Sequence, residues 1–453
     1  MIEQVKSIVL TVLILTSLVL SGLLWYRSPN VEEINRTDYI PQQLIGESYQ
    51  LEELVKPRSI VYHPGDGSHL MSFSGDDVYD LITESLPEWQ LVSIEEKTMT
   101  TAEWERMLSE LPGWELRFPV PVPASLFSER LIPGLNQLEE DLRIDRLWVY
   151  RQQDDLSVLL ISDIDNKIYE SDMVSPKEGN VFAQKQELGL LNVLPVVERI
   201  VSANPYEPVS VRINYFPEKE LTMPEWKASL QETDVEQMKI LLFLDPSLVR
   251  TVTDAEEGTV VMQDGSRTVR YVEANNMLYY QNYKMKLDAK PISSDLHEAV
   301  QFINHHGGWM ADHRLVQIEG TQSEDKPNRY GFRLVKDGLP VYDEGDQNRY
   351  GTLMAVESKG GHVLRYERSL HFTEEDEYSQ STPVTGGPQA LEHLKAEFDM
   401  ADVRDMYPAY RIQKKDDDLT YLPGWRIEFR NGDETWFEVP ADEDEGGEAN
   451  GLE

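Results

Sequence analysis

Cysteine is absent from the 453 residues of this chain. Its absence excludes disulfide bonds, thiolate zinc sites and a cysteine nucleophile, and it suits an exported protein built without oxidative cross-links. Basic side chains are scarce, since 42 Lys and Arg residues against 81 Asp and Glu residues leave a net charge of -39. Such a surface repels nucleic acids and anionic lipids, so we expect the body to bind neither. The acidity is equally compatible with solubility in a salty or alkaline medium and with a binding role.

Short catalytic motifs are missing as well, including G-x-S-x-G, the Walker loop and H-E-x-x-H. One segment, HPGDGSH, brings together four side chains of the kind used in hydrolases: His63, Asp66, Ser68 and His69. Members of a catalytic triad normally come from distant parts of a chain, so this Gly-rich segment is predicted to be a loop. We expect no hydrolase activity from it.

A second histidine-rich segment, NHHGGWMADH, contains four possible metal ligands: His305, His306, Asp312 and His313. His305 and His306 fall at the predicted C-terminal end of a helix, where an imidazole complements the helix dipole without a metal. We therefore expect no metal here, and no residue pattern in the chain indicates a cofactor.

Long apolar runs are also rare, and the one exception is KSIVLTVLILTSLVLSGLLWYRSPN at residues 6–30. Its uncharged stretch covers 17 residues, and Trp25 and Tyr26 extend it towards the ~20 residues of a spanning helix. A signal peptide has a shorter apolar core of ~7 to 15 residues, although cleavage before Gly22 is conceivable. Because the run continues past that point, we predict an uncleaved anchor. The N-terminus is expected in the cytoplasm and the body outside, at the cell membrane, since long domains translocate largely regardless of charge.

Small and hydroxyl-bearing residues lie along this predicted anchor. Helices associate in lipid through such residues, because they let two backbones approach closely. Ser17 and Ser21 are four residues apart on one helical face, with Thr11 and Gly22 nearby. These four residues are the candidate contacts with a partner helix. The alternative is that the serines are merely tolerated on a lipid-facing surface.

Helices and strands are interleaved along the rest of the chain, which predicts an α+β body with antiparallel sheets. Helix starts are predicted from capping patterns at five places: Ser74 with Asp77, Thr100 with Glu103, Thr222 with Glu225, Asp295 with Glu298, and Gly386 to Pro388. The fourth helix is expected to bury one stripe, Leu296, Ala299, Val300 and Ile303. Strands are predicted at 146–151, 156–162 and 166–171, with hairpin turns at 264–265 and 275–276.

Shifts in composition divide the chain into five segments. They are a stub and anchor at 1–27, α+β domains at 28–178, 179–290 and 291–440, and an acidic Gly-rich tail at 441–453 that is predicted to be disordered. Within the third domain a helix followed by an antiparallel meander occurs twice, offset by about 90 residues. We expect the two meanders to share one sheet.

The anchor sequence at residues 6–30, a Cys-free body of about 425 residues and the helix-plus-meander units after Lys290 together resemble the YycH family. Members of this family are single-pass membrane proteins encoded beside the WalK/WalR two-component system. The resemblance implies a non-enzymatic accessory protein that acts on the WalK sensor histidine kinase within the membrane, together with a YycI-like partner. It implies no catalytic residues, and the acidity of this chain departs from the family.

A different class of function also fits the sequence. The body could be an exported cell-wall ligand-binding protein or hydrolase with a groove lined by tryptophans. A homodimer is possible in either case. The sequence leaves open whether regulation is inhibitory or activating, and what the body senses.

Overall fold

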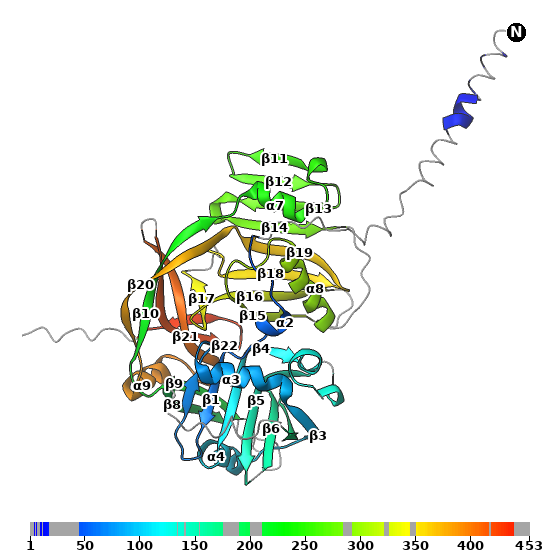
Figure 1. Cartoon of the computed structure of the whole chain (residues 1–453). Coiled ribbons are helices and arrows are strands. Elements are labelled where there is room, and N and C mark those ends of the chain that lie inside the picture. The colour runs from blue at the N-terminus through cyan, green and yellow to red at the C-terminus, as the bar shows by residue number, and fades with distance from the viewer. Residues whose placement is uncertain are drawn as a thin grey trace, which may run out of the picture. The chain divides into compact units, whose positions relative to one another are not determined.

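The computed structural model separates into two units, residues 1–43 and 44–453 (Figure 1). It describes residues 4, 6, 10 and 12–17 of the first unit, and residues 45–133, 135–139, 142–153, 155–174, 190–199, 211–283, 292–320, 326–344, 350–415 and 418–438 of the second. Residues 12–17 are helical and exposed. Among the described residues, no helix is both long and apolar enough to cross a bilayer. Most of the predicted anchor, and all of the predicted tail at 441–453, lie outside them.

The described part of the second unit is built on two large sheets. One has nine strands in the order β3-β7-β6-β5-β4-β1-β2-β8-β9. The other has fourteen, in the order β11-β12-β13-β14-β19-β18-β16-β17-β21-β22-β10-β20, with β15 on β16 and β23 on β22. Among these strands only β17 and β21 pair in parallel. The prediction of mixed helices and mostly antiparallel sheets is therefore confirmed.

The strands of the nine-stranded sheet are β1 (Ser59–His63), β2 (Leu70–Ser72), β3 (Gln90–Glu96), β4 (Gly113–Pro123), β5 (Arg143–Gln152), β6 (Asp155–Ser162), β7 (Lys167–Val174), β8 (Leu191–Arg199) and β9 (Val211–Pro217). Those of the fourteen-stranded sheet are β10 (Leu221–Glu232), β11 (Arg250–Asp254), β12 (Thr259–Gln263), β13 (Arg267–Val272), β14 (Met277–Asn282), β15 (His313–Glu319), β16 (Asn328–Lys336), β17 (Leu339–Asp343), β18 (Leu353–Lys359), β19 (His362–Ser369), β20 (His371–Val384), β21 (Val403–Lys415), β22 (Asp418–Phe429) and β23 (Glu434–Phe437).

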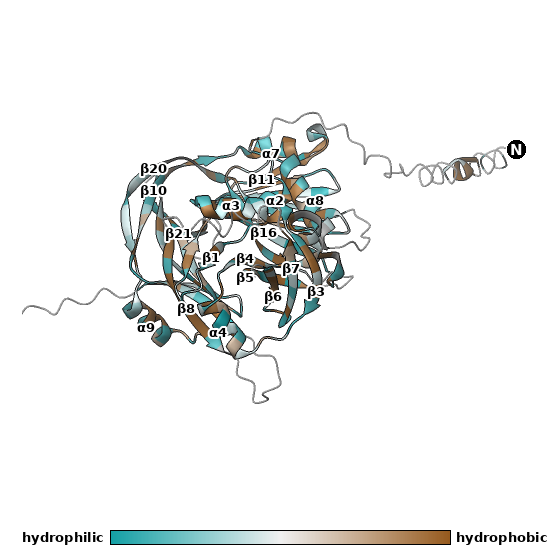
Figure 2. Ribbon diagram, turned by 60° about the horizontal axis from the view of Figure 1, so that its bottom comes forward, coloured by the Kyte–Doolittle hydropathy of each residue, from teal (hydrophilic) through white to brown (hydrophobic). Residues whose placement is uncertain are grey.

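The helices that cover these sheets are α2 (Leu51–Leu54), α3 (Asp77–Ser85), α4 (Thr101–Ser109), α5 (Ala124–Leu126), α7 (Val235–Leu242), α8 (Ile292–His305) and α9 (Pro388–Glu397). Buried apolar side chains of the nine-stranded sheet belong to two clusters, and Figure 2 marks hydrophobic residues along β5 and β6 in brown. Helices α3 and α4 contribute to different apolar clusters, with Tyr79 of α3 in one and Trp104 of α4 in the other. The cluster that contains α3 also contains α8 and β16, so one apolar core joins the two sheets.

Two predicted helix starts can be compared directly. At α4 the prediction is confirmed, because Thr100 Oγ1 accepts a hydrogen bond from Glu103 N and the Glu103 carboxylate accepts one from Thr100 N. At α3 the predicted cap was wrong by two residues. The residue before this helix is Asp76, whose carboxylate accepts a hydrogen bond from Phe73 N at 2.9 Å, whereas Ser74 lies in the preceding loop. Ser and Asp are both good caps, so residue type alone did not separate them.

The predicted helix start at Thr222 to Glu225 was wrong, because these residues lie in β10. This strand pairs with β20 along its whole length, from Leu221 to Glu232. It pairs with β22 only between Trp226 and Ser229, so Pro224 lies where one side of the strand is an edge. A proline is tolerated there, since its missing N–H interrupts no ladder on that side. The capping pattern was a local signal that long-range strand pairing overrode.

Helix α8 begins before its predicted cap, so the assignment of Asp295 as the cap was also wrong. Asp295 lies inside the helix and is buried, and its carboxylate accepts hydrogen bonds from Gly361 N at 2.6 Å and Asn328 Nδ2 at 3.0 Å. It thus joins the helix to β16 and to the turn before β19. The predicted buried stripe is confirmed, since every member is fully buried: Leu296, Ala299, Val300 and Ile303.

The sheets divide the sequence differently from the predicted domains, whose limits remain a prediction. Strands β8 and β9, from the segment 179–290, pair into the nine-stranded sheet through β2. Strand β10, from the same segment, lies in the other sheet between β22 and β20. The meanders that follow α8 and α9 both lie in the fourteen-stranded sheet, as expected.

A tight hairpin connects β16 to β17 and touches the loop before α3. Asp337 and Gly338 form its two-residue turn, both with positive φ (49° and 76°), as type I′ geometry requires. A Cβ added at Gly338 would lie 1.9 Å from the carbonyl oxygen of Ser74. Gly265, in the turn between β12 and β13, has a similar φ of 89° but nothing within 4 Å of an added Cβ.

These two glycines allow a matched test of that contact. Both Gly338→Ala and Gly265→Ala place alanine in the left-handed region, which costs roughly 1 to 2 kcal/mol. Gly338→Ala should lose about 1 to 3 kcal/mol more, because the hairpin must also move away from the Ser74 loop. Denaturant unfolding of the two variants measures the difference. Equal destabilisation would show that the hairpin does not pack tightly against that loop.

Candidate functional site

The four predicted membrane-contact residues lie in the first unit. Ser17 is helical and exposed. Thr11, Ser21 and Gly22 lie outside the described residues. Whether these residues form a contact face therefore stays a prediction.

The HPGDGSH segment forms the predicted loop between β1 and β2. Ser68 Oγ donates to Asp66 Oδ1 at 2.6 Å, so this hydroxyl is engaged within the loop. The two histidines instead face each other inside the protein, with 2.9 Å between their Nδ1 atoms. Burial lowers the pKa of His63 below its usual value, and burial and the neighbouring His63 lower that of His69 to about 4. The pair therefore belongs to the interior rather than to an exposed triad.

The second histidine segment lies at the end of α8, as predicted, and His306 contacts the helix terminus through a hydrogen bond rather than through a charge. Burial lowers the pKa of His306 to about 4, so its ring is neutral at pH 7 and cannot complement the helix dipole by charge. Its Nδ1 lies 2.7 Å from the carbonyl oxygen of Phe302, in the last turn of the helix. Within the described part of the chain, no three His, Asp or Glu side chains are grouped to hold a metal ion.

A buried group of charged side chains is centred on Glu115 of β4, whose carboxylate is fully buried. Its Oε1 atom accepts hydrogen bonds from Arg117 Nη1 at 3.0 Å and Arg146 Nη1 at 3.2 Å. Its Oε2 atom accepts one from the Tyr215 hydroxyl at 2.6 Å. Burial alone would raise the pKa of Glu115, but the guanidinium groups of Arg117 and Arg146 hold it well below its usual range. Glu115 is therefore ionised and fixes both arginines.

Arg117 and Arg146 line a cavity at the point where the pairing of β4 with β5 is interrupted. Arg117 is paired with Arg146, and the next paired residue of β4 is Val122, opposite Ile144. Four residues of β4 thus face only Asp145 across the break. Pro119 and Pro121 lie within it, and proline has no N–H to continue a ladder. The proline pattern in FPVPVP is the local cause of this opening.

The other wall comes from the fourteen-stranded sheet and contains a second irregularity. The pairing of β21 with β22 shifts between Val403, opposite Phe429, and Asp405, opposite Glu428. This shift is a β-bulge with Arg404 as its extra residue, and a bulge changes the direction in which a side chain points. Its Nη1 atom donates to Glu428 Oε1. Asp405 in turn pairs with Arg117 across the boundary between the sheets, at 3.3 Å.

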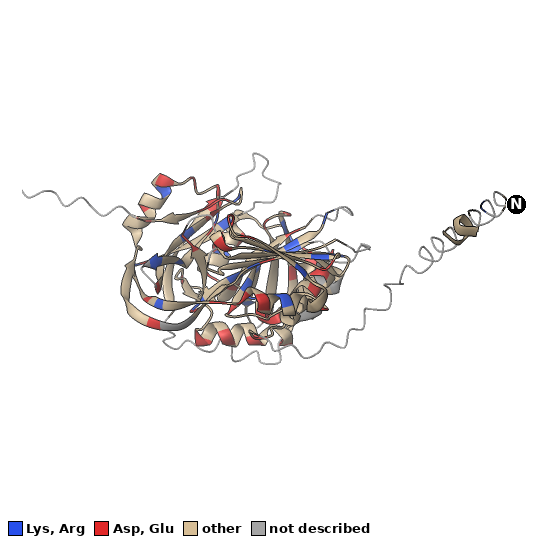
Figure 3. Cartoon of the chain, turned by 90° about the horizontal axis from the view of Figure 1, so that it is seen from above, with Lys and Arg blue, Asp and Glu red and all other residues tan. Residues whose placement is uncertain are grey.

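The cavity between these walls has a volume of ≈ 400 Å³, within the range of small-molecule sites. It is lined by Arg117, Phe118, Pro119, Asp145, Arg146, Asp163, Ile164, Arg212, Arg404, Asp405 and Arg430. Five arginines against three aspartates give this lining a formal charge of 5 minus 3, or +2, in a chain whose total is -39. Acidic positions are spread over the helices and strands of the body (Figure 3). The cavity is thus a cationic site in an acidic protein.

Two of these arginines share one acceptor. Arg212 Nη1 and Arg430 Nε both donate to the carbonyl oxygen of Ala401, at 3.0 and 3.1 Å. Among the described residues, neither guanidinium has a carboxylate within ion-pair distance. Partial burial and the charge of Arg212 lower the pKa of Arg430 from its usual value. Two like charges are therefore held together at the cavity wall.

Asp145 and Asp163 both line this cavity, and the backbone N–H of Asp163 donates to Asp145 Oδ2 at 2.8 Å. Burial and the charge of Asp163 raise the pKa of Asp145 to about 7. Asp163 is paired with Arg146 at 2.8 Å. Near neutral pH Asp145 is thus partly protonated, which makes the lining still more positive.

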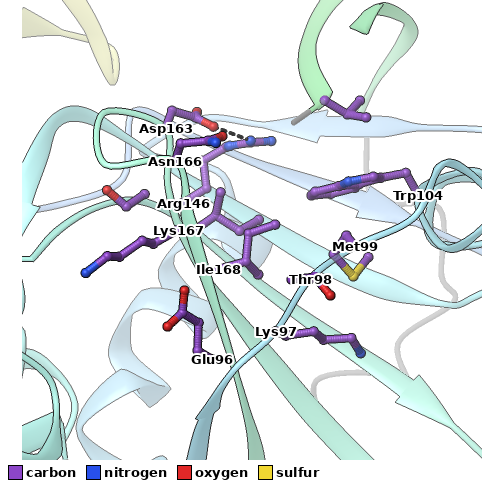
Figure 4. Close-up of a pocket in the computed structure, with 13 residues that line it drawn as sticks. Glu96, Lys97, Thr98, Met99, Trp104, Arg146, Asp163, Asn166, Lys167 and Ile168 are labelled. Atoms are coloured by element: carbon purple, nitrogen blue, oxygen red, sulfur yellow. Dashed lines mark hydrogen bonds and ion pairs between the residues drawn. The ribbon is translucent and has the colours of Figure 1, made fainter. Parts of the chain in front are cut away.

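A smaller pocket of ≈ 40 Å³ is also lined by the Arg146 and Asp163 pair, which is thus common to both spaces. Figure 4 shows this pair joined at one end of the pocket, with Trp104 and Met99 near each other at one side. Its volume is sufficient for one or two waters rather than for a larger ligand. The larger cavity is therefore the candidate site. The sequence did not predict it, because its lining residues are far apart in the chain, between residues 117 and 430.

Comparisons with known proteins match this chain over nearly its whole length. Residues 3–187 match the family model of the YycH protein N-terminal domain, and residues 212–441 that of the C-terminal domain. A Bacillus subtilis (strain 168) protein described as "Two-component system WalR/WalK regulatory protein YycH" is 22% identical over 449 residues, covering 94% of each chain. The crystal structure of YycH from Bacillus subtilis is similar in fold, with a TM-score of 0.67 and 18% identity, over 87% of this chain and 98% of that one.

Proposed function

We propose, from the premise that this chain belongs to the YycH family, that it is a regulator of a WalK/WalR-type two-component system. The observation that carries the proposal is the alignment with a relative that is described as such a regulator, over 94% of both chains. The family models match residues 3–187 and 212–441, so the similarity to the family includes both the N-terminal segment and the body. In this proposal the chain acts by contact with other proteins and not as an enzyme.

We further propose that the contact through which the chain regulates the kinase lies in the membrane. In this proposal residues 1–27 form an uncleaved anchor, with the N-terminus in the cytoplasm and the body outside. The anchor packs against a WalK-type kinase, together with a YycI-like membrane protein, and a homodimer is a further possible assembly. The apolar run of residues 8–24 and its small and hydroxyl residues support this arrangement.

Co-purification tests the proposed contact. The full chain, extracted from membranes in detergent and captured through a C-terminal tag, is expected to bring down a WalK-type kinase. A matched capture of an unrelated single-pass protein controls for carry-over. Abundant recovery of this chain without the kinase would count against the contact.

Substitutions in the anchor would measure how much the proposed contact contributes to the free energy of helix association. Ser17→Leu with Ser21→Leu should remove hydroxyl bonds worth about 0.6 kcal/mol each and block close approach of the helices. A total of roughly 1.4 kcal/mol would weaken association about tenfold. The control, Leu13→Ile with Leu20→Ile, keeps both serines and the hydrophobicity of the segment. A reporter of kinase output, read at equal membrane abundance, should respond to the serine variant alone, and equal responses would mean that this face is not the contact.

A second function, an exported ligand-binding protein that uses its body, is favoured by the cationic cavity. Replacing residues 31–453 by a neutral soluble domain separates the two. Regulation that persists supports action through the anchor. Complete loss of regulation, at normal membrane abundance, supports action through the body.

A further inference from the structure

We propose that the arginine-lined cavity binds a small anion through a phosphate group. This inference goes beyond the proposed regulatory function, because it assigns a ligand to the body, whatever the anchor contacts. The carrying observation is that Arg212 and Arg430 converge on a single neutral acceptor, the carbonyl oxygen of Ala401. A phosphate bound between the two guanidinium groups would replace their mutual repulsion with two charge-assisted contacts.

The rest of the lining is held in place before any ligand arrives. Arg117 and Arg146 are each fixed by Glu115, and Arg404 is fixed by Glu428. The Nε atom of Arg146 is buried and has no hydrogen-bond partner among the described residues. This atom has almost no accessible surface, so the donors that Arg146 holds in place are its two Nη groups, bound to Glu115 and Asp163. Preorganised donors also bind more tightly, because little side-chain freedom is lost.

Charge and size both restrict the ligand. With Glu115, Glu428 and Arg58 included, the group has six arginines and five carboxylates, so its formal charge is 6 minus 5, or +1. A long polyanion would have to lie along the surrounding acidic surface, which repels it. A volume of ≈ 400 Å³ leaves room for more than one phosphate ion. A small phosphate ester or free phosphate therefore fits, whereas a nucleic acid does not.

Guanidinium groups also bind carboxylates, but the arrangement favours phosphate. One carboxylate presents two oxygens in a plane and is satisfied by one guanidinium fork. Here the arginines come from five positions on both sheets and surround a common space: Arg117, Arg146, Arg212, Arg404 and Arg430. A tetrahedral phosphate presents oxygens in several directions and matches donors that converge in this way.

Calorimetric titration of the full chain in detergent tests the proposal, with sodium phosphate against sodium chloride at equal ionic strength. Saturable binding of phosphate alone is expected. Arg212→Gln with Arg430→Gln should weaken it by about tenfold or more, since two charge-assisted contacts are lost. Arg106→Gln, which changes an exposed arginine of α4, should leave it unchanged. Equal heats with phosphate and chloride, or equal affinity of the two arginine variants, would overturn the proposal.

A second variant tests the site without touching an arginine. Ile164 lies at the cavity and is 59% exposed, so Ile164→Asp should fold normally while adding a negative charge beside the ligand. Its control is Ile164→Asn. Phosphate affinity should fall for the Asp variant alone, and equal affinities would contradict the site. Titration with glycerol phosphate then distinguishes the sources: tighter binding than inorganic phosphate indicates an ester, and equal binding indicates free phosphate. Because these readouts involve no kinase, they do not depend on the proposed regulatory function.

Discussion

Replacing Glu115 with Ala is expected to lower the free energy of unfolding by about 3 kcal/mol, the low end for breaking a buried ion pair. The change removes the shared acceptor of Arg117 and Arg146 and leaves both guanidinium groups buried. The low end applies because Arg117 keeps Asp405 and Arg146 keeps Asp163. Denaturant unfolding followed by circular dichroism measures the loss.

The control for this prediction is Glu110→Ala, which removes a surface pair with Arg106 on α4. The Glu110 side chain is 68% exposed, so the loss should stay within about 1 kcal/mol. If Glu115→Ala were as stable as Glu110→Ala, the buried charges would not organise this part of the fold. The cavity would then have no fixed wall.

Asp145→Asn is expected to change how stability depends on pH. Burial and Asp163 raise the pKa of Asp145 to about 7 in the folded protein, against about 3.9 in an unfolded chain. Between these values the folded state holds the extra proton, so the contribution of Asp145 is fully present below about pH 4 and is lost as the pH rises through 7. The full difference corresponds to at most about 4 kcal/mol.

The Asn variant mimics the protonated side chain and can still accept the hydrogen bond from Asp163 N. It should be more stable than the parent at pH 8 and differ little from it at pH 4. Subtracting the two curves removes the effect of the many other carboxylates. The control is Asp418→Asn, an exposed position in β22, which should give a difference near zero at both pH values. Parallel curves for the parent and Asp145→Asn would show that this carboxylate is not buried beside Asp163.

The sequence correctly predicted elements that are determined by residues close together in the chain. The capping box at Thr100 formed as expected, and the turns at 264–265 and 275–276 join the expected strands, with Asn276 in the left-handed region that such turns require. Thr222 carried a similar local signal, yet strand pairing between β10 and β20 determined the outcome. Capping patterns report a helix only where no distant strand competes.

The cavity could not be predicted in the same way, because its residues are distant in sequence. Arg212 and Arg430 meet only after β9 and the end of β22 are brought together at the boundary of the two sheets. Two local hints existed: the alternating prolines of FPVPVP, which suit an interrupted strand, and arginines in an acidic chain. Neither hint shows that Arg117 and Arg404 line the same space.

The regulatory role itself is tested most directly by the phosphorylation state of the WalR-type response regulator in cells. Phosphate-affinity electrophoresis would compare the parent strain, a strain lacking this chain, and that strain with the full chain restored. We expect the phosphorylated fraction to change when the chain is removed and to return with the full chain, but not with the Ser17→Leu, Ser21→Leu variant. An unchanged phosphorylated fraction in the strain lacking the chain would contradict the assignment of this protein as a regulator of that system.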